Sequence, residues 1–277
     1  MEITRTASYK VWESRERAYL FARWSFEPAN RAVVFVHGLM SSWDVWVPFR
    51  LLVERPEMAS ADVFYFDYKS LGTTIPRASR RFREALEGLL DGASPAFIHE
   101  SLPPGRPKPT YATIDIVSHS LGAVVARTAL TELASAISGE KDLAQPPAWK
   151  VDQLLLAPAL LGSKLPWLMK YVGTEALLSA IQFVRNGGVS AVMDLKEGSD
   201  LLKRLENHVK DRIKESPVAA KACGLRVART AHGEDDHVVI QNQYARDANY
   251  KLRDGNHFTI VPKAVAVDSD FIFGRAR

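Results

Sequence analysis

The stretch TIDIVSHSLG, residues 113–122, decides how this chain folds. A run of strand-forming residues stops at Ser120, and the helix-forming residues 123–127 follow it. A strand, a tight turn and a helix in this order predict a strained turn that holds the serine hydroxyl clear of the backbone. The positions two before and two after the serine must be small, because strand and helix crowd them, and they are Ser118 and Gly122. We therefore expect Ser120 to be a nucleophile.

Apolar runs on either side of this stretch extend the same pattern. Strands are expected at 19–26, 32–36, 62–66, 113–117, 151–156 and 225–228, and helices after residues 41–42, over 77–90 and after Ser120. The first two strands are expected to be neighbours. Strands that alternate with helices predict a mostly parallel sheet with right-handed crossovers and helices on its faces. We expect one α/β domain over residues 1–277, with a surface loop at 93–109.

Residues 161–223 interrupt this alternation. Two apolar helix-like pieces, at 165–172 and 177–184, precede a charged amphipathic one at 200–214. The interruption predicts a helical cap inserted over the carboxyl edge of the sheet. Two interpretations remain open: the apolar residues pack down on the core, or they form a lid that also lines an acyl pocket.

Charge argues against a nucleic-acid partner. Lys and Arg number 36 against 32 Asp and Glu, a mild excess, and the basic runs at 77–83 and 203–214 are interleaved with acids or apolar residues. Such runs are typical of solvated helix faces rather than of a phosphate track. Contact of residues 165–172 and the basic helical segments with a membrane surface is a further hypothesis.

Cysteine content and hydropathy indicate the compartment. Cys223 is the only cysteine, so an intrachain disulfide and a cysteine metal cluster are both excluded, and a buried apolar role is expected for it. The N-terminal residues lack a long apolar segment, and no run approaches the roughly 18 residues that span a bilayer. We expect a soluble, cytoplasmic protein.

A nucleophilic serine needs an imidazole to take its proton and a carboxylate to orient that imidazole. Residues 225–236 predict a strand that runs into a Gly-x-x-Asp turn, which delivers Asp236 to the carboxyl edge of the sheet. Asp235 is the alternative acid, with turn capping as its other expected role. His257 lies in a polar turn and is the one histidine beyond the acid that is not directly beside it. Asp236 and His257 are therefore the expected acid and base.

The positions of the other histidines in the sequence predict roles other than that of the base. His237 lies too close to Asp236 in sequence to reach Ser120, and His119 is expected to point away along the turn and to pack. His99 lies in a predicted loop and His208 in a predicted charged helix, so we expect both side chains to be exposed.

An acyl-transfer site also needs donors for the oxyanion, typically two backbone N–H groups. Leu121, directly after the nucleophile, supplies one of them. Gly38 allows the loop after residues 32–36 to turn the N–H of Leu39 toward the site, with Met40 the less favoured donor. His37 is interpreted as a hydrogen-bonding brace for this loop.

From residues 33–38 through 118–122 to Asp236 and His257, the chain resembles an α/β-hydrolase over roughly residues 30–265. Residues 117–127, 256–261 and 65–68 are most similar to the lipase-like serine esterases related to GPI-inositol deacylases. The resemblance implies hydrolysis of carboxylic or lipid esters without a metal or an organic cofactor. Met40 and Ser118 depart from the family pattern, since each stands where a glycine is common.

The expected function is a serine esterase that forms an acyl-enzyme on Ser120, with a small-molecule or lipid ester as substrate. Amide, thioester or lactone hydrolysis remain alternatives, because one such site serves all acyl transfers. A hydrolase fold that only binds its ligand is the non-enzymatic alternative.

Overall fold

The computed structural model describes residues 9–14, 18–25, 28–49, 61–91, 105–139, 146–164, 191–226, 228–239, 250–252, 256–257 and 259–262. Within these residues, eight strands form one sheet in the order β1-β2-β4-β3-β5-β6-β7-β8. They are β1 (Tyr9–Glu13), β2 (Tyr19–Arg23), β3 (Arg31–Val36), β4 (Ala61–Asp67), β5 (Thr113–His119), β6 (Lys150–Leu156), β7 (Ala228–Gly233) and β8 (Tyr250–Leu252). Strands β4, β3, β5, β6, β7 and β8 are parallel, while β1 and β2 add antiparallel pairs at one edge. The predicted mostly parallel sheet is confirmed.

Strands β2 and β3 are not neighbours, so that expectation was wrong. β3 pairs on one side with β4 and on the other with β5, both in parallel, and its two edges are therefore occupied. β2 pairs antiparallel with the outer edge of β4 instead. Strand β7 also begins three residues later than predicted, because residues 223–225 form a turn around Gly224, whose φ is +64°.

Both faces of the central strands are covered, which explains why they are apolar throughout. Phe35 of β3 lies beside Tyr65 of β4, and Phe35 packs on Trp46 and Phe49 of the 3₁₀ helix η1 (Trp43–Phe49). The next residue along β4, Phe66, points to the opposite face and packs on Phe82 of α2 (Ile75–Asp91). Because side chains alternate along a strand, η1 and α2 cover opposite faces of the sheet.

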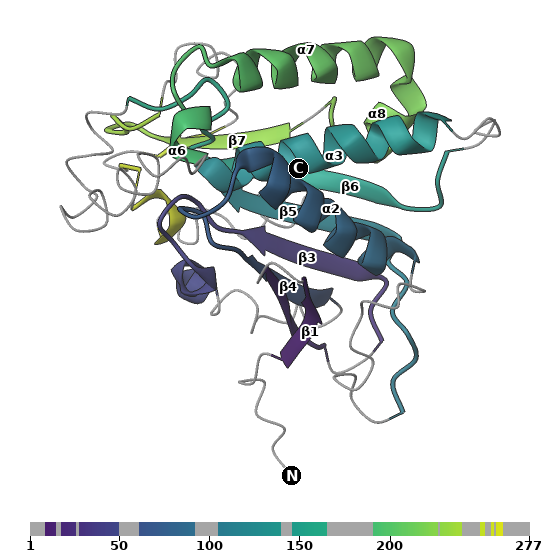
Figure 1. Ribbon diagram of the computed structural model, residues 1–277. Coiled ribbons are helices and arrows are strands. Elements are labelled where there is room, and N and C mark those ends of the chain that lie inside the picture. The colour runs from purple at the N-terminus through teal and green to yellow at the C-terminus, as the bar shows by residue number, and fades with distance from the viewer. Residues whose placement is uncertain are drawn as a thin grey trace.

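Helix α3 (Leu121–Gly139) lies against the sheet beside α2 (Figure 1). It is the one helix among the described residues with the length and hydropathy to cross a membrane. Most of its apolar residues are nevertheless buried, because α3 is packed between β5 on one side and its neighbouring helices on the others. The length and apolarity of α3 are therefore accounted for by its place inside the domain.

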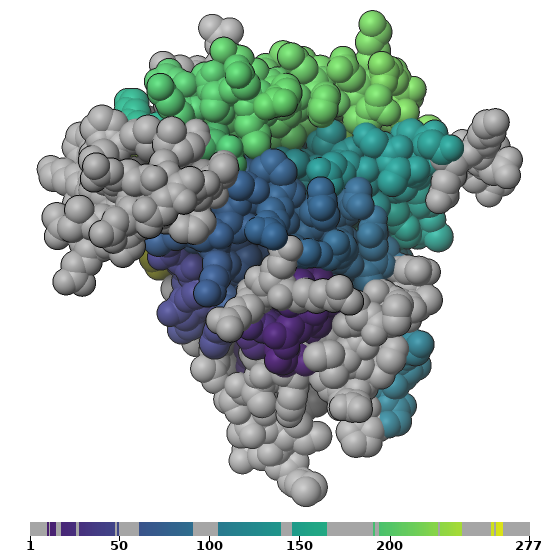
Figure 2. Space-filling view, in the orientation of Figure 1, coloured from purple at the N-terminus to yellow at the C-terminus, as the bar shows by residue number. Residues whose placement is uncertain are grey.

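The region predicted as a cap, 161–223, contains three described helices: α6 (Ala191–Asp194), α7 (Asp200–Glu215) and α8 (Pro217–Ala222). Helices α7 and α8 contact α3, and Figure 2 shows them (green) along the outer surface next to it. The two apolar pieces at 165–172 and 177–184 lie outside the described residues. The adjoining residues are anchored near the carboxyl edge, where Lys164 donates its backbone N–H to Val238 and Ala191 donates its own to Thr73. A cap over residues 161–223 stays a prediction.

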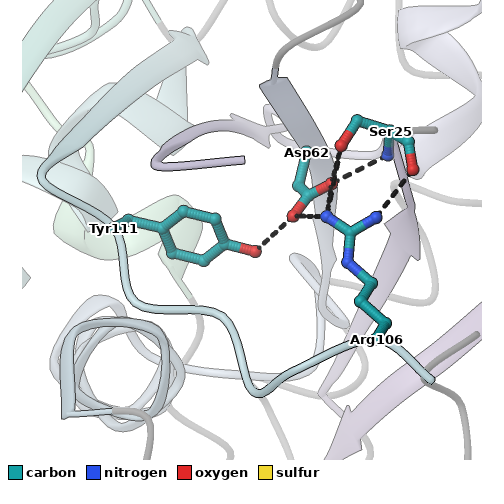
Figure 3. Close-up of polar contacts among 4 residues, drawn as sticks. All are labelled: Ser25, Asp62, Arg106 and Tyr111. Atoms are coloured by element: carbon teal, nitrogen blue, oxygen red, sulfur yellow. Dashed lines mark hydrogen bonds and ion pairs between the residues drawn. The ribbon is translucent and has the colours of Figure 1, made fainter. Parts of the chain in front are cut away.

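A buried ionic network closes the opposite, amino edge of the sheet (Figure 3). Asp62 lies in β4 and is fully buried. Both of its carboxylate oxygens accept a hydrogen bond from Nη2 of Arg106, each at 2.7 Å. Tyr111 donates its hydroxyl to Asp62 at 2.8 Å, and Ser25 donates both its backbone N–H and its hydroxyl. Nη1 of Arg106 donates in turn to the carbonyl of Ser25 at 2.6 Å. The network ties the segment before β5 to the ends of β2 and β4.

Candidate active site

Ser120 occupies a strained turn between β5 and α3. Its φ is +53°, in the left-handed region that residues other than glycine seldom adopt. The strand β6 anchors the turn, because Ser120 donates its N–H to the carbonyl of Leu156 at 3.0 Å. The carbonyl of Ser120 accepts from the N–H groups of Ala123 and Ala159. The turn predicted from sequence is present, and neighbouring backbone holds it.

The small residues around Ser120 have different reasons to be small. A Cβ built at Gly122 would lie 2.4 Å from the carbonyl oxygens of both Val36 and His37, so only glycine fits where α3 crosses the end of β3. Ser118 is fully buried between its sheet partners Val36 and Leu155, where its Cβ is tolerated. Its hydroxyl has no hydrogen-bond partner among the described residues. Glycine is therefore a steric requirement at position 122 but not at 118.

The structure brings the three predicted side chains together. Nε2 of His257 lies 2.8 Å from Oγ of Ser120, and Nδ1 of His257 lies 3.0 Å from Oδ2 of Asp236. All three residues are buried. The distances suit a chain in which Ser120 donates to His257, and His257 donates to Asp236.

Asp236 is fixed by its own turn, and Asp235 is not part of the site. Oδ1 of Asp236 accepts the N–H groups of Val238 at 2.9 Å and Val239 at 3.3 Å, which leaves Oδ2 for His257. Burial alone would raise the pKa of Asp236, but the hydrogen bond and charge of His257 and these two amides lower it below its ordinary value. Asp235 is exposed, and these two turn-capping hydrogen bonds are made by Asp236.

The other described histidines lie in different surroundings. His208 of α7 and His237 are exposed, whereas His232 of β7 is buried; His99 lies outside the described residues. His119 differs from its expectation, because its ring does not point away along the turn. Nε2 of His119 lies 2.9 Å from the carbonyl oxygen of His257. The ring turns toward the base because His119 ends a strand at the edge where the His257 turn also lies.

The loop after β3 lies directly against the nucleophile. A Cβ built at Gly38 would lie 3.0 Å from Cβ of Ser120, so this loop passes beside the serine and glycine leaves the room for it. Met40 has a φ of +56°, which explains why glycine is common at this position. The N–H of Met40 donates to Oγ of Ser70 at 2.8 Å. Met40 is thus committed to Ser70, which leaves Leu39 as the donor expected from this loop.

His37 braces the loop as predicted, through partners that the sequence did not indicate. Its Nδ1 lies 2.9 Å from the carbonyl of Gly38, and its Nε2 lies 3.1 Å from Asp67 and 3.2 Å from the N–H of Tyr68. The hydroxyl of Tyr68 donates to the carbonyl of His37 at 3.0 Å, and the two rings stack. Burial, followed by the charge of Asp67, raises the pKa of Tyr68 well above its ordinary range, so its hydroxyl stays a donor.

Leu121 is the first residue of α3. Backbone N–H groups in the first turn of a helix have no carbonyl partner within the helix and carry the positive end of its dipole. Its amide is therefore placed to meet negative charge next to Ser120. Among the described residues, no group of three His, Cys, Asp or Glu side chains lies together as a metal ion would need.

Comparison with known proteins agrees with this architecture. Three solved structures cover most of the chain at low identity. The first is from a study of carboxylesterases of the thaumarchaeon Nitrososphaera gargenis: TM-score 0.52, 12% identity, covering 96% of this chain and 97% of that one. The second is the mature lipase BlEst2 of Bacillus licheniformis, with a TM-score of 0.50, 17% identity, and coverage of 89% and 94%. The third is the carboxylesterase CesB of Bacillus subtilis, with a TM-score of 0.50, 12% identity, and coverage of 97% and 92%.

At these identities the likeness concerns the fold alone. The chain has no significant match among curated protein sequences. A family model described as "Alpha/beta hydrolase family" matches residues 33–267, which is most of the chain. This protein therefore belongs to the alpha/beta hydrolase family.

Proposed function

We propose that this protein is a serine hydrolase that cleaves carboxylic esters through an acyl-enzyme on Ser120. One observation carries the proposal: Nε2 of His257 lies 2.8 Å from Oγ of Ser120 while its Nδ1 lies 3.0 Å from Asp236. This arrangement lets the imidazole take the serine proton while the carboxylate stabilises the positive ring that results. The carboxylesterases and the lipase among the structural neighbours support a hydrolase of this kind.

In the proposed cycle, Oγ of Ser120 attacks the ester carbonyl as its proton moves to Nε2 of His257. The backbone N–H groups of Leu39 and Leu121 donate to the oxyanion that forms. When the tetrahedral intermediate collapses, His257 gives its proton to the leaving alcohol and the acyl group stays on Ser120. His257 then takes a proton from water as the water oxygen attacks the acyl carbonyl. When this second tetrahedral intermediate collapses, His257 returns the proton to Oγ of Ser120 and the carboxylic acid is released. Every proton moves between groups already present, so the cycle uses no cofactor or metal.

The substrate class belongs to the same proposal. Residues 117–127 and 256–261 resemble the esterases related to GPI-inositol deacylases, which favours a lipid or small acyl ester over a polymer. We also propose contact with a membrane surface, which is where a lipid ester would be found. The composition supports our proposals of a cytoplasmic location and of no nucleic-acid partner. Rates on p-nitrophenyl esters of rising chain length, set beside a thioester, an anilide and a lactone, separate ester hydrolysis from its alternatives.

Covalent labelling tests the proposal most directly. We expect a fluorophosphonate probe to modify the wild-type protein and to leave Ser120→Ala unmodified, because only an activated serine attacks the probe. Ser135→Ala provides the matched control, since Ser135 is an exposed residue on the same helix that follows the nucleophile. Intact mass spectrometry should show one added group on the wild type and on Ser135→Ala. Equal labelling of Ser120→Ala would overturn the assignment, and so would the absence of labelling in the wild type.

A further inference from the structure

His119 lies between the parts of the candidate site. Its Nε2 is 2.9 Å from the carbonyl oxygen of His257, and the centroids of the two imidazole rings are 4.9 Å apart. On its other side, Nδ1 lies 3.1 Å from the position of a Cβ built at Gly38, so the loop of residues 37–40 passes against the ring. His119 thus contacts the turn that carries the base and the loop expected to bind the oxyanion, and it is covalently joined to Ser120.

The contact with His257 determines the tautomer of His119. A carbonyl oxygen only accepts, so Nε2 of His119 carries the proton and donates it. In the neutral ring Nδ1 is then a bare acceptor, and it has no hydrogen-bond partner among the described residues. Burial, followed by the charge of His257, lowers the pKa of His119 to about 3. A ring that stays neutral near pH 7 does not repel the positive charge that His257 acquires during acylation.

Two hydrogen bonds join the same two short segments at different points. Oγ of Ser120 contacts the side chain of His257, while the neighbouring residue, His119, contacts the backbone of His257. Ser120 and Asp236 hold the two nitrogens of the His257 ring, and the contact from His119 adds a restraint on the backbone from which that ring extends. The His257 turn is further braced by Asn256 and Thr259, which each accept the backbone N–H of the other through their side chains.

From this geometry we infer that His119 is a positioning residue. By donating a hydrogen bond to the backbone carbonyl of His257, it sets the distance between the His257 imidazole and Oγ of Ser120. The inference rests on the proposed function, in which Ser120 and His257 carry out hydrolysis. This role differs from packing, because packing would require only the volume of the His119 ring, whereas positioning also requires a proton on Nε2. Displacement of a reacting group by about 1 Å can lower a rate by roughly a hundredfold.

Two substitutions separate the proton on Nε2 from the volume of the ring. His119→Phe keeps a buried aromatic ring and removes the donor, while His119→Gln places an amide NH₂ near the position of Nε2. We expect kcat for an ester to fall about tenfold to a hundredfold in His119→Phe, with KM within about twofold, because the loss falls on the geometry of the reacting groups. His119→Gln should recover most of that loss. Val209→Ala, which trims a buried residue of α7, controls for lowered stability.

A second readout does not depend on esterase activity. In proton NMR, the Nδ1–H of His257 bonded to Asp236 should give a far-downfield resonance in the wild type that disappears in His257→Gln. We expect this resonance to broaden in His119→Phe, and to persist in His119→Gln and Val209→Ala. If the wild type hydrolyses no ester, the proposed function fails, while the NMR comparison still tests the role of His119.

Each rate is corrected for the folded fraction, and the results then distinguish a positioning role of His119 from a packing role. A low kcat in His119→Phe with recovery in His119→Gln supports the positioning role. Equal losses in His119→Phe and His119→Gln overturn it, because they would indicate a response to packing alone. Wild-type kcat and an unchanged resonance in His119→Phe overturn it as well.

Discussion

Asp235 and Asp236 show how much one position in a turn decides. Asp236 is buried and divides its two oxygens between the backbone of residues 238–239 and His257, whereas Asp235 is exposed. The two residues have the same side chain, so composition cannot separate their roles. Amides and the nearby imidazole hold the pKa of Asp236 below its ordinary value, and its carboxylate is therefore ionised at neutral pH, as an acid that orients a base must be.

The same substitution at Asp236 and at Asp235 gives a test and its matched control. Asp236→Asn should lower kcat at pH 7 by up to about four orders of magnitude, because an amide does not hold the required tautomer of His257 or stabilise its positive form. Asp235→Asn, which makes the same change one residue earlier, should keep kcat near the wild-type value. Ester hydrolysis followed at a saturating substrate concentration measures both. Similar rates for the two variants would exclude Asp236 as the acid of the site.

At the scale of elements, the segment after β4 holds the segment after β3. Residues 67–70 contact residues 37–40 through the ring and carbonyl of His37 and through the N–H of Met40. Met40 is in a left-handed conformation, which costs about 1–2 kcal/mol for a residue other than glycine. The bond from Met40 to Ser70 helps hold this conformation, so the loop of residues 37–40 depends on the segment after the neighbouring strand β4.

Tyr68→Phe tests this dependence. The change removes the hydroxyl that donates to the carbonyl of His37 and leaves the stacked ring in place. We expect kcat to fall about tenfold with KM little changed, because the donor that we propose at Leu39 would act on charge that develops only in the transition state.

The matched control for Tyr68→Phe is Tyr111→Phe, which removes a buried hydroxyl bonded to Asp62 at the other edge of the sheet. This control should lower the melting temperature and leave kcat per folded molecule unchanged. A kcat loss of the same size in both variants would show that the effect of Tyr68→Phe is not local.

At the scale of the whole molecule, two clusters of buried polar side chains lie at opposite edges of one sheet. The carboxyl edge holds Ser120, Asp236 and His257, and the amino edge holds the network of Asp62 and Arg106 (Figure 3). At the amino edge, Arg106 also lies over the ring of Trp24. We therefore expect the amino edge to contribute to stability, while the proposed chemistry takes place at the carboxyl edge.

Arg106→Met should accordingly lower stability without lowering kcat. Removal of one partner of a buried ion pair leaves an uncompensated charge, and we expect the free energy of unfolding to fall by about 3–5 kcal/mol. Urea denaturation of Arg106→Met, Asp62→Asn and the double variant measures this fall and the coupling between the two residues. The double variant should lose less than the sum of the single ones. Additive losses below about 1 kcal/mol would show that the pair behaves like a surface salt bridge.

The sheet could be predicted because its signals are local. Buried parallel strands are continuous apolar runs, and β3, β4, β5 and β6 were each placed within two residues of their bounds. β7 was displaced by three residues because Leu225 is apolar but belongs to the turn, where its N–H donates to the carbonyl of Ala220. The false pairing of β2 with β3 arose because adjacency in the chain says nothing about which strand already occupies an edge.

The sequence by itself determined the strained turn at Ser120, since glycine at 122 and the strand-to-helix change are properties of a few consecutive residues. It also determined the order in which serine, acid and histidine occur along the chain. Only the tertiary structure decided which of two adjacent aspartates meets His257, where the ring of His119 points, and that residues 67–70 hold the loop of residues 37–40. These contacts join residues that lie up to 138 positions apart, and their geometry depends on how separate strands end at one edge. No local pattern records such an arrangement, because it exists only once the sheet has brought those ends together.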